Sequence, residues 1–265
     1  MASMPEPPPR PDRTAVLATG LTKRFGEKLA VDALTLAVPP GSFFGLVGPN
    51  GAGKTTTLKM ATGLLRPDAG SVSVDGLDVW GDSVRVKARI GVVPEELRLF
   101  ERLTGHELLT YNGLLRGLPP DVVEARATEL LQVLGIADAG DTLVVDYSHG
   151  MKKKAALACA LIHAPRVMFL DEPFEAIDPV SARTIRAVLE RHVAAGATVV
   201  FSSHVMDVVE RLCDRVAVIH QGRVVADGAV DQVKGTGTLE DAFVRLVGGG
   251  EADVGALRWL DTSSD

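Results

Sequence analysis

The run from Gly48 to Thr55 constrains the fold of this chain more than any other feature. It matches the pattern GxxxxGK[ST], in which glycines let consecutive backbone N–H groups turn inward around an anion. The mostly apolar residues 42–47 before it predict a short buried strand, and residues 56–65 carry apolar side chains at helical spacing. A strand, a glycine loop and a helix N-terminus form the arrangement that a phosphate needs. The run therefore predicts a nucleoside triphosphate site, against the alternative of a glycine-rich surface turn.

The positions of this loop have expected roles at the nucleotide. Lys54 adds a positive charge toward the β- and γ-phosphates, and the Thr55 hydroxyl is placed to ligate Mg²⁺. The other positions supply backbone groups and small side chains around the phosphates. The residues expected to contact the nucleotide are Gly48, Pro49, Asn50, Gly51, Ala52, Gly53, Lys54, Thr55 and Thr56.

Two acidic residues follow a second apolar run. Residues 167–170 are continuously apolar, as in a strand buried on both faces, and Asp171 and Glu172 come directly after them. The carboxyl ends of parallel strands meet at one edge of a sheet, so Asp171 is expected beside the glycine loop, where it would hold Mg²⁺. Glu172 is then placed to orient or deprotonate an attacking water. The alternative is a solvated acidic turn.

A second potential anion site lies between these motifs. Ser148 resembles a helix N-cap, because Gly150 and an alanine-rich helical pattern running to Ile162 follow it. A serine hydroxyl beside a glycine at a helix N-terminus can bind phosphate. One nucleotide needs only one phosphate cradle, so this site indicates that two copies of the chain share their nucleotides. At least one of the lysines at 152–154 is expected to face solvent, since adjacent helical residues point in different directions.

The order of these motifs resembles the ATP-binding cassette (ABC) ATPases over about residues 14–228. That family has an α/β fold: a P-loop ATPase core with an N-terminal antiparallel β subdomain and an inserted α-helical lobe. Further matches are Glu95 at the family's Q-loop, Ser148-His149-Gly150 at its signature, Asp178 in its D-loop, His204 in its H-loop, and Phe25 where an aromatic ring stacks on adenine.

The resemblance implies a head-to-tail dimer that encloses two ATP molecules. Each ATP would lie between one chain's phosphate loop and the other chain's signature, which Ser148, His149 and Gly150 form here. His204 would contact the γ-phosphate and hold Glu172 and the water in place, and Asp178 would lie at the subunit interface. For an isolated histidine, capping of a strand end is the better interpretation, but the ordered motifs favour the catalytic one.

The resemblance also implies ATP and Mg²⁺ as cofactors, with Thr55, Glu95 and Asp171 around the metal. Glu95 replaces the family's glutamine, which adds negative charge near Mg²⁺ and the triphosphate. Catalysis is therefore expected to be slower or more dependent on the metal concentration. His149 replaces a glycine; we hypothesise that it donates to the γ-phosphate, so that activity falls as pH rises, and a packing role is an equal alternative.

Patterns along the chain predict its division into segments. Residues 1–13 are proline-rich and predict a disordered tail, and residues 14–237 predict the ATPase domain, with the helical lobe at about 97–160. Residues 238–265 predict a C-terminal helix and a flexible tail. Within the domain, alternating apolar stretches at 14–38 predict the antiparallel subdomain. Helical patterns at 107–115 and 121–134 predict two helices of the lobe.

Composition narrows the functional classes. The chain has 265 residues, and no run of 18 apolar residues is free of charge, so it is not expected to cross a membrane by itself. The net charge of −6 gives no reason to expect a nucleic-acid partner. An apolar signal segment is missing from the first residues, which favours a cytoplasmic location. Cys159 and Cys213 lack metal-site spacing and are expected to be buried free thiols.

The leading hypothesis is an ATPase subunit that powers a separate integral membrane permease at the inner face of the cell membrane. It would act as a homodimer, or as a heterodimer with a similar subunit, and its Q-loop and signature variants favour an exporter. The alternative is a non-transport ABC ATPase acting on ribosomes or DNA. Such members usually carry two cassettes or long coiled coils, whereas this chain has one cassette and no sustained heptads. A P-loop kinase or GTPase would leave Ser148 and His204 unexplained.

Overall fold

A six-stranded sheet forms the centre of the fold in a computed structural model that describes residues 14–248. The tail predicted at 1–13 and nearly all of the predicted C-terminal tail lie outside the described residues. The sheet has the order β10-β9-β3-β8-β7-β6, and all of its pairs are parallel except β10 with β9. Its strands are β3 (Phe43–Val47), β6 (Ile90–Val93), β7 (Val167–Asp171), β8 (Thr198–Ser203), β9 (Arg215–His220) and β10 (Arg223–Ala229).

Side chains of β3 alternate between two hydrophobic cores. Phe43 and Val47 belong to one core, and Phe44 and Leu46 belong to the other. Successive strand residues point to opposite faces, so a parallel sheet that is covered on both sides buries an uninterrupted apolar run. The first core continues into the helical lobe, and the second joins the central sheet to a smaller one.

The smaller sheet is antiparallel and has the order β2-β1-β4-β5, as predicted for the N-terminal subdomain. Its strands are β1 (Val16–Phe25), β2 (Lys28–Val38), β4 (Ala69–Val74) and β5 (Leu77–Asp78). Helix α1 (Lys54–Ala61) contributes Leu58 and Met60 to the core that this sheet shares with the central sheet. The helix predicted at 56–65 was placed wrongly at both ends. It begins at Lys54 and ends at Ala61, and Leu64 is exposed.

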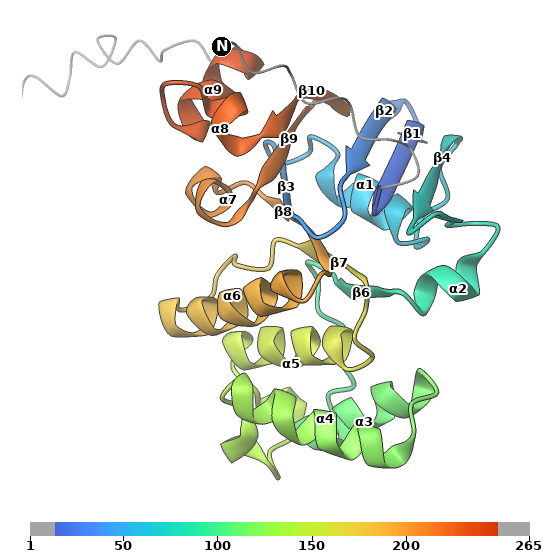
Figure 1. The fold of residues 1–265 in the computed structure, drawn as a ribbon, viewed down its shortest axis with the longest axis vertical. Helices are drawn as coiled ribbons and strands as arrows, with labels where there is room; N and C mark the ends of the chain where they lie inside the picture. Colours follow the sequence, from blue (N-terminus) through green and yellow to red (C-terminus); the bar gives the residue numbers. More distant parts are fainter. Residues whose placement is uncertain (1–13, 249–265) are drawn as a thin grey trace, which may run out of the picture.

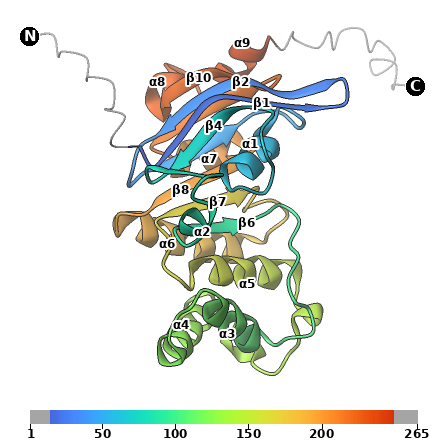
Figure 2. The same cartoon turned by 90° about the vertical axis from the view of Figure 1, so that its right-hand side faces the viewer.

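Three helices build the lobe at one end of the molecule (Figures 1 and 2). They are α3 (Gly105–Leu115), α4 (Pro120–Val133) and α5 (His149–Leu161), with the short turns η2 (Ala137–Ala139) and η3 (Val144–Asp146) between the last two. Helix α5 lies between the α3–α4 pair and the central sheet. A Cβ on Gly91 of β6 would come within 2.5 Å of the Ala160 carbonyl oxygen, so α5 packs directly on the sheet edge.

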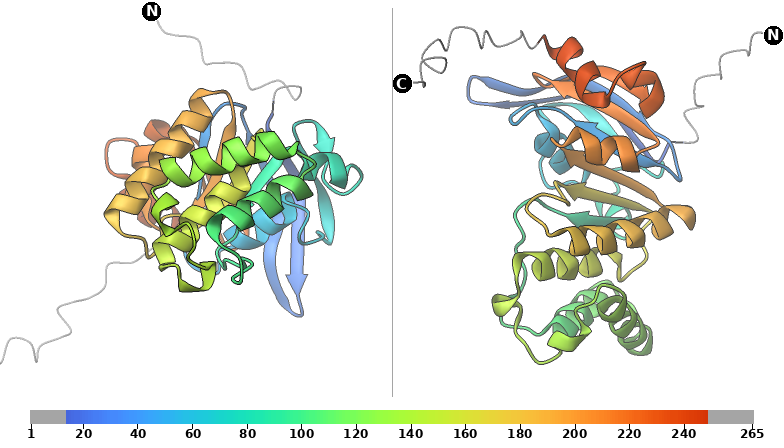
Figure 3. Two further views of the ribbon diagram at one scale, coloured as in Figure 1. Left: turned by 90° about the horizontal axis from the view of Figure 1, so that it is seen from below. Right: turned by 90° about the vertical axis from the view of Figure 1, so that its left-hand side faces the viewer.

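The remaining helices lie around the two sheets and at the end opposite the lobe (Figure 3). They are α2 (Ser83–Lys87), α6 (Pro179–Ala194), α7 (Met206–Leu212), α8 (Val230–Lys234) and α9 (Leu239–Val247). Helix α9 confirms the helix predicted near the C-terminus, with Thr238 as its N-cap. Within residues 14–248, no helix combines the length and the apolar character that a membrane crossing requires.

Candidate functional site: a phosphate cradle between β3 and α1

The loop between β3 and α1 needs glycine because neighbouring backbone approaches it closely. A Cβ on Gly48 would lie 2.2 Å from the Ile219 carbonyl oxygen, and one on Gly53 would lie 2.6 Å from that of Ala30. Gly53 also has φ 108°, a conformation that side chains with a Cβ rarely adopt. These contacts fix the path of the loop at the carboxyl end of β3.

Helix α1 begins at this loop without a side-chain cap. Its N-cap is Gly53, no side chain accepts from its first N–H groups, and its first turn has no acidic residue. Such a helix start presents free N–H donors and the positive end of the helix dipole to an anion. Lys54 is 5% exposed, and its Nζ donates to the Gly48 carbonyl at 2.8 Å. The loop, the helix start and the ammonium group together fit a phosphate chain.

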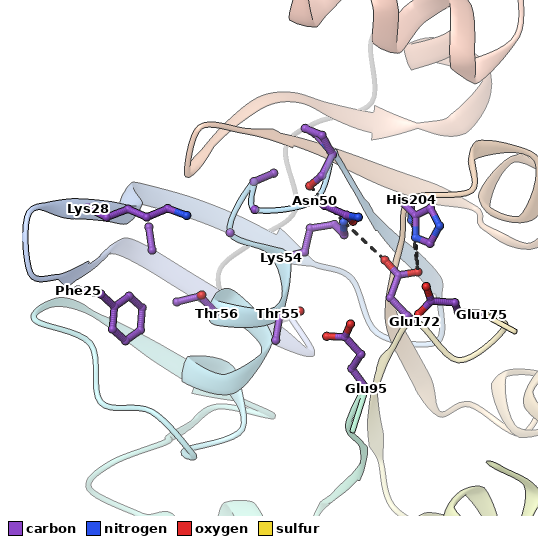
Figure 4. Close-up of a pocket in the computed structure, with 15 residues that line it drawn as sticks. Phe25, Lys28, Asn50, Lys54, Thr55, Thr56, Glu95, Glu172, Glu175 and His204 are labelled. Atoms are coloured by element: carbon purple, nitrogen blue, oxygen red, sulfur yellow. Dashed lines mark hydrogen bonds and ion pairs between the residues drawn. The ribbon is translucent and has the colours of Figure 1, made fainter. Parts of the chain in front are cut away.

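These groups line a cavity of about 380 Å³ (Figure 4). The expected nucleotide contacts from Pro49 to Thr56 all border it, together with Phe25, Glu95, Glu172 and His204. Phe25 is the last residue of β1 and is 51% exposed, so its ring is accessible for stacking. Figure 4 shows the Glu95 carboxylate on the side of the cavity where Thr55 and Glu172 lie.

Asp171 lies beside the loop, as the parallel strands predict. Its Oδ1 accepts from Thr55 Oγ1 at 3.2 Å and from Ser202 Oγ at 2.5 Å. Asp171 and Ser202 are direct neighbours in the β7–β8 ladder. The Ser202 hydroxyl at the end of β8 can therefore orient the Asp171 carboxylate at the end of β7. The hydroxyl of Thr55 and the carboxylate of Asp171 are hard oxygen ligands of the kind that Mg²⁺ prefers.

Glu172 lies buried between a lysine and a histidine. Its Oε1 is 3.6 Å from Lys54 Nζ, and its Oε2 is 3.1 Å from His204 Nδ1. The backbone N–H of His204 also donates to Oε2 at 3.4 Å. The carboxylate is therefore held from two sides while it borders the cavity (Figure 4).

The predicted signature residues do not line this cavity. Ser148 caps α5 by accepting from the Met151 N–H, and both Ser148 and His149 are exposed. Gly150 lies against α6 instead, where a Cβ would come within 3.1 Å of Asp178 Oδ2. Asp178 caps α6, and its hydrogen bonds to Ser181 lower the pKa of its carboxyl group. The predicted signature residues and Asp178 thus lie outside the cavity of the chain's own phosphate loop.

Several residues of the site were missed by the sequence analysis. Ser202 bridges the two acidic residues, and its only signal was its place at the end of a strand next to β7. Lys28 and Glu175 border the cavity without belonging to any motif considered above. Of the lysines at 152–154, Lys152 is partly exposed and pairs with Glu101 at 3.0 Å, while Lys153 and Lys154 are buried.

This combination of glycine loop, buried lysine and acidic pair on neighbouring parallel strands defines a P-loop nucleotide-binding protein. The profile of the family described as "ABC transporter" matches residues 31–175. The linearmycin resistance ATP-binding protein LnrL of Bacillus subtilis (strain 168) is 37% identical over 80% of this chain and 68% of its own length. The daunorubicin/doxorubicin resistance ATP-binding protein DrrA of Streptomyces peucetius is 40% identical over 83% and 67%. The chain belongs to the ABC transporter family, as one of its ATP-binding proteins.

Solved structures agree with this assignment. The chain superimposes on an "ATP binding subunit of ABC transporter" with a TM-score of 0.83 and 28% identity, over 88% of this chain and 99% of the other. CbiO1 from Clostridium perfringens, described as part of the ABC transporter complex cbiONQ, matches with a TM-score of 0.74 and 25% identity, over 88% and 94%. The α/β cassette fold expected from the motifs is therefore confirmed.

Proposed function

We propose that this chain hydrolyses ATP to power a separate integral membrane permease, and that the assembly is an exporter. The observation that carries the hydrolysis is the position of Glu172. A buried carboxylate is held by Lys54 and His204 at the wall of a cavity that ends in a phosphate cradle. A protein that only binds nucleotide has no need of this arrangement.

In this proposal, Phe25 stacks on adenine, and the loop from Gly48 to Thr56 holds the phosphates. Lys54 exchanges its hydrogen bond with the Gly48 carbonyl for the β- and γ-phosphate oxygens. The free N–H groups at the start of α1 then face the phosphate chain. Binding is therefore dominated by backbone donors and one ammonium group, which are in place before the nucleotide arrives.

Hydrolysis in this proposal uses Glu172 as the general base. The Glu172 carboxylate orients a water for in-line attack on the γ-phosphorus and accepts its proton as the bond to the β–γ bridging oxygen breaks. His204 keeps the Glu172 carboxylate in place through Oε2 and reaches toward the γ-phosphate. Thr55 and Asp171, with Glu95 nearby, would hold Mg²⁺, which neutralises charge on the phosphate oxygens.

The signature completes the site from a second copy of the chain. Ser148 and His149 are exposed at the start of α5, where helix N–H groups and a hydroxyl favour an anion. They do not border the chain's own cavity, so a head-to-tail partner is the geometry that brings them to a γ-phosphate. Asp178, which adjoins Gly150, then lies at the interface between the two copies.

A groove on the lobe is the proposed docking site for the permease. It has a volume of about 820 Å³ and is lined by residues 97–103 and Tyr111. Phe100 and Tyr111 pack edge to face at 5.1 Å and are 57% and 45% exposed. An aromatic pair of this kind suits an anchor for an apolar helix. Residues 97–103 of the groove come shortly after Glu95 in the chain. A shift of Glu95 when nucleotide binds can therefore be transmitted to a bound permease.

The relatives' names support the direction of transport. LnrL and DrrA are named for resistance to linearmycin and daunorubicin, and a Burkholderia lata relative at 41% identity is named a Nod factor export ATP-binding protein. Export is an outward process, and resistance supplied by a transporter fits removal of the compound from the cell. We therefore assign this chain to an exporter, located on the cytoplasmic face of the membrane through its permease.

The test combines hydrolysis with partner capture. The full chain, purified from detergent-solubilised native membranes, should hydrolyse ATP with Mg²⁺ and should bring a multi-spanning membrane protein in near-equal amount. Lys54→Ala should weaken ATP binding by about 10-fold or more, because it removes a charge-assisted contact. Phe100→Asp should retain ATP binding and lose the membrane protein.

Different results would point elsewhere. Copurification of ribosomal or DNA-repair proteins with no membrane protein would favour the non-transport alternative. Hydrolysis restricted to GTP, or phosphoryl transfer to a small acceptor, would contradict the assignment of the site.

A further inference from the structure

Lys153 is a buried cation whose role the motifs do not explain. It lies in α5, is 7% exposed, and directs its ammonium group at the backbone of another segment. Its Nζ donates to the carbonyl oxygens of Glu172 at 2.9 Å and Glu175 at 2.5 Å. Burial lowers the pKa of Lys153, while the carboxylates of Glu175, Glu172 and Glu95 oppose that shift. Burying an ammonium group costs free energy unless it is hydrogen-bonded, so we expect the contacts of Lys153 to have a specific role.

Both carbonyls belong to the tight turn that carries the acidic base. The Glu175 N–H donates to the Glu172 carbonyl at 3.2 Å, which closes the turn. Glu172 and Ala176, at its two ends, have φ values of 48° and 51°. Residues with a Cβ rarely adopt this left-handed conformation, and they keep it only where neighbouring groups hold them.

The turn is held by three sets of contacts. Ser202 Oγ accepts from the Glu172 N–H at 3.0 Å, and the Phe174 ring packs edge to face on Phe201 at 5.9 Å. Lys153 supplies the third by donating to the carbonyls. The first two contacts would keep the turn attached to the core without Lys153, but they leave its carbonyls without a charged donor.

We propose that Lys153 is a positioning residue that fixes the turn from Glu172 to Ala176, so that the Glu172 carboxylate stays between Lys54 and His204. Lys153 does not border the cavity, so it acts through Glu172 and not through contact with ATP. The inference rests on the proposed hydrolytic role of Glu172. It predicts a loss in kcat with little change in KM, since the phosphate cradle is built by other residues.

The chain offers a matched control beside this residue. Lys152 is its neighbour in the same helix, but its ammonium group pairs with Glu101 at 3.0 Å, away from the turn. Lys153→Met removes the donor and keeps an unbranched side chain of nearly the same length. Lys153→Gln keeps a neutral donor, Lys153→Arg keeps the charge, and Lys152→Met removes a lysine without touching the turn.

Two readouts separate positioning from general stability. The first is kcat and KM for ATP, and the second is hydrogen exchange of the backbone amides at residues 172–178. Lys153→Met should lower kcat by about 10-fold or more, with KM within about twofold of wild type, and should speed exchange in this segment. Lys153→Arg should restore most of the rate, Lys153→Gln should be intermediate, and Lys152→Met should match wild type.

Each outcome decides the inference. Wild-type kcat and wild-type exchange in folded Lys153→Met would overturn it, and so would a rise in KM at constant kcat. If Lys153→Met fails to fold, Lys153→Gln takes its place, and a wild-type rate in that variant together with unchanged exchange overturns the inference. If the wild-type chain itself does not hydrolyse ATP, the proposed function fails, and the exchange of residues 172–178 alone decides whether Lys153 fixes the turn.

Discussion

Ser202 connects the two acidic residues of the site at the level of single hydrogen bonds. Its hydroxyl donates to Asp171 Oδ1 and accepts from the Glu172 N–H, and its side chain is fully buried. One oxygen thus orients the proposed metal ligand and the backbone of the proposed base. This arrangement makes the end of β8 as important to the site as the end of β7.

Ser202→Ala is expected to lower both stability and turnover. It leaves the buried N–H of Glu172 without its acceptor, which costs about 1–3 kcal/mol in the free energy of unfolding. Denaturant unfolding and kcat for ATP check this. Ser203→Ala is the control, because within residues 14–248 the Ser203 hydroxyl bonds only to the backbone of Val205; this variant should lose stability and keep more of kcat. Equal kcat in both variants would contradict the role given to Ser202.

At the same scale, the sequence predicted the residues that motifs identify and missed those that only packing brings together. Asp171 and Thr55 are far apart in the chain but meet as predicted, since both follow parallel strands. Lys153 gave no signal, because nothing in a run of three lysines says which of them are buried, and Lys154 is buried too. Glu175 and Lys28 border the cavity through the path of a turn and a strand, which periodicity does not predict.

At the scale of elements, the contact between α5 and β6 depends on Gly91. An added Cβ would lie 2.5 Å from the Ala160 carbonyl oxygen and 3.0 Å from Pro165 Cγ. Gly91→Ala should therefore lower the free energy of unfolding by about 1–3 kcal/mol through overpacking. Gly140→Ala is the control, because a Cβ at Gly140 would lie 3.5 Å from its nearest neighbour, the Ala137 carbonyl oxygen. Its loss in unfolding free energy should be much smaller. Chemical denaturation of the two variants tests the difference, and equal losses would contradict it.

Hydrogen bonds also join the lobe to the core near His163. Arg126 of α4 donates to the Ile162 carbonyl, and His163 Nε2–H donates to the Ile90 carbonyl at 3.0 Å. His163 Nδ1 is buried without a hydrogen-bond partner in the described part of the chain. Burial, and then the nearby Arg116 guanidinium, lower the pKa of His163 to about 4. This junction is therefore built around a neutral histidine.

The low pKa of His163 predicts a loss of stability in acid. Between pH of about 6.5 and about 4, the unfolded chain binds a proton at this residue and the folded chain does not, so stability falls as pH falls through that window. His163→Gln retains a donor for the Ile90 carbonyl and removes the titration. Its unfolding free energy should decline less than that of wild type between pH 7 and pH 5. The same decline in both proteins would refute this role.

Most elements were predictable because their apolar periodicity is strong. The strand at 167–171 and the helices α3, α4 and α9 lie close to their expected positions. The end of α1 was not predicted, since Leu64 and Leu65 continue the helical spacing while Gly63 adopts φ 73°, which ends the helix. At the end of α1, the backbone conformation of Gly63 therefore decides where the helix stops, although the apolar pattern continues.

At the scale of the whole molecule, the two halves of the proposed ATP site lie on different surfaces of one chain. The phosphate cradle borders the cavity, whereas Ser148 caps α5 and Gly150 lies beside Asp178 at the start of α6. In the proposed dimer, each chain would therefore provide half of each of two sites. The second anion motif of the sequence predicts this pairing, whose geometry depends on contacts between two chains.

The most direct test of this account is the oligomeric state of the full-length Glu172→Gln variant, measured by light scattering with ATP and Mg²⁺ and again with ADP. The amide keeps the shape of the side chain and removes the base, so ATP should stay intact and hold two chains together. We predict a dimer with ATP, a monomer with ADP, and a monomer in both when Ser148→Arg is added. A Glu172→Gln chain that binds ATP to saturation and remains monomeric would contradict the shared-nucleotide site.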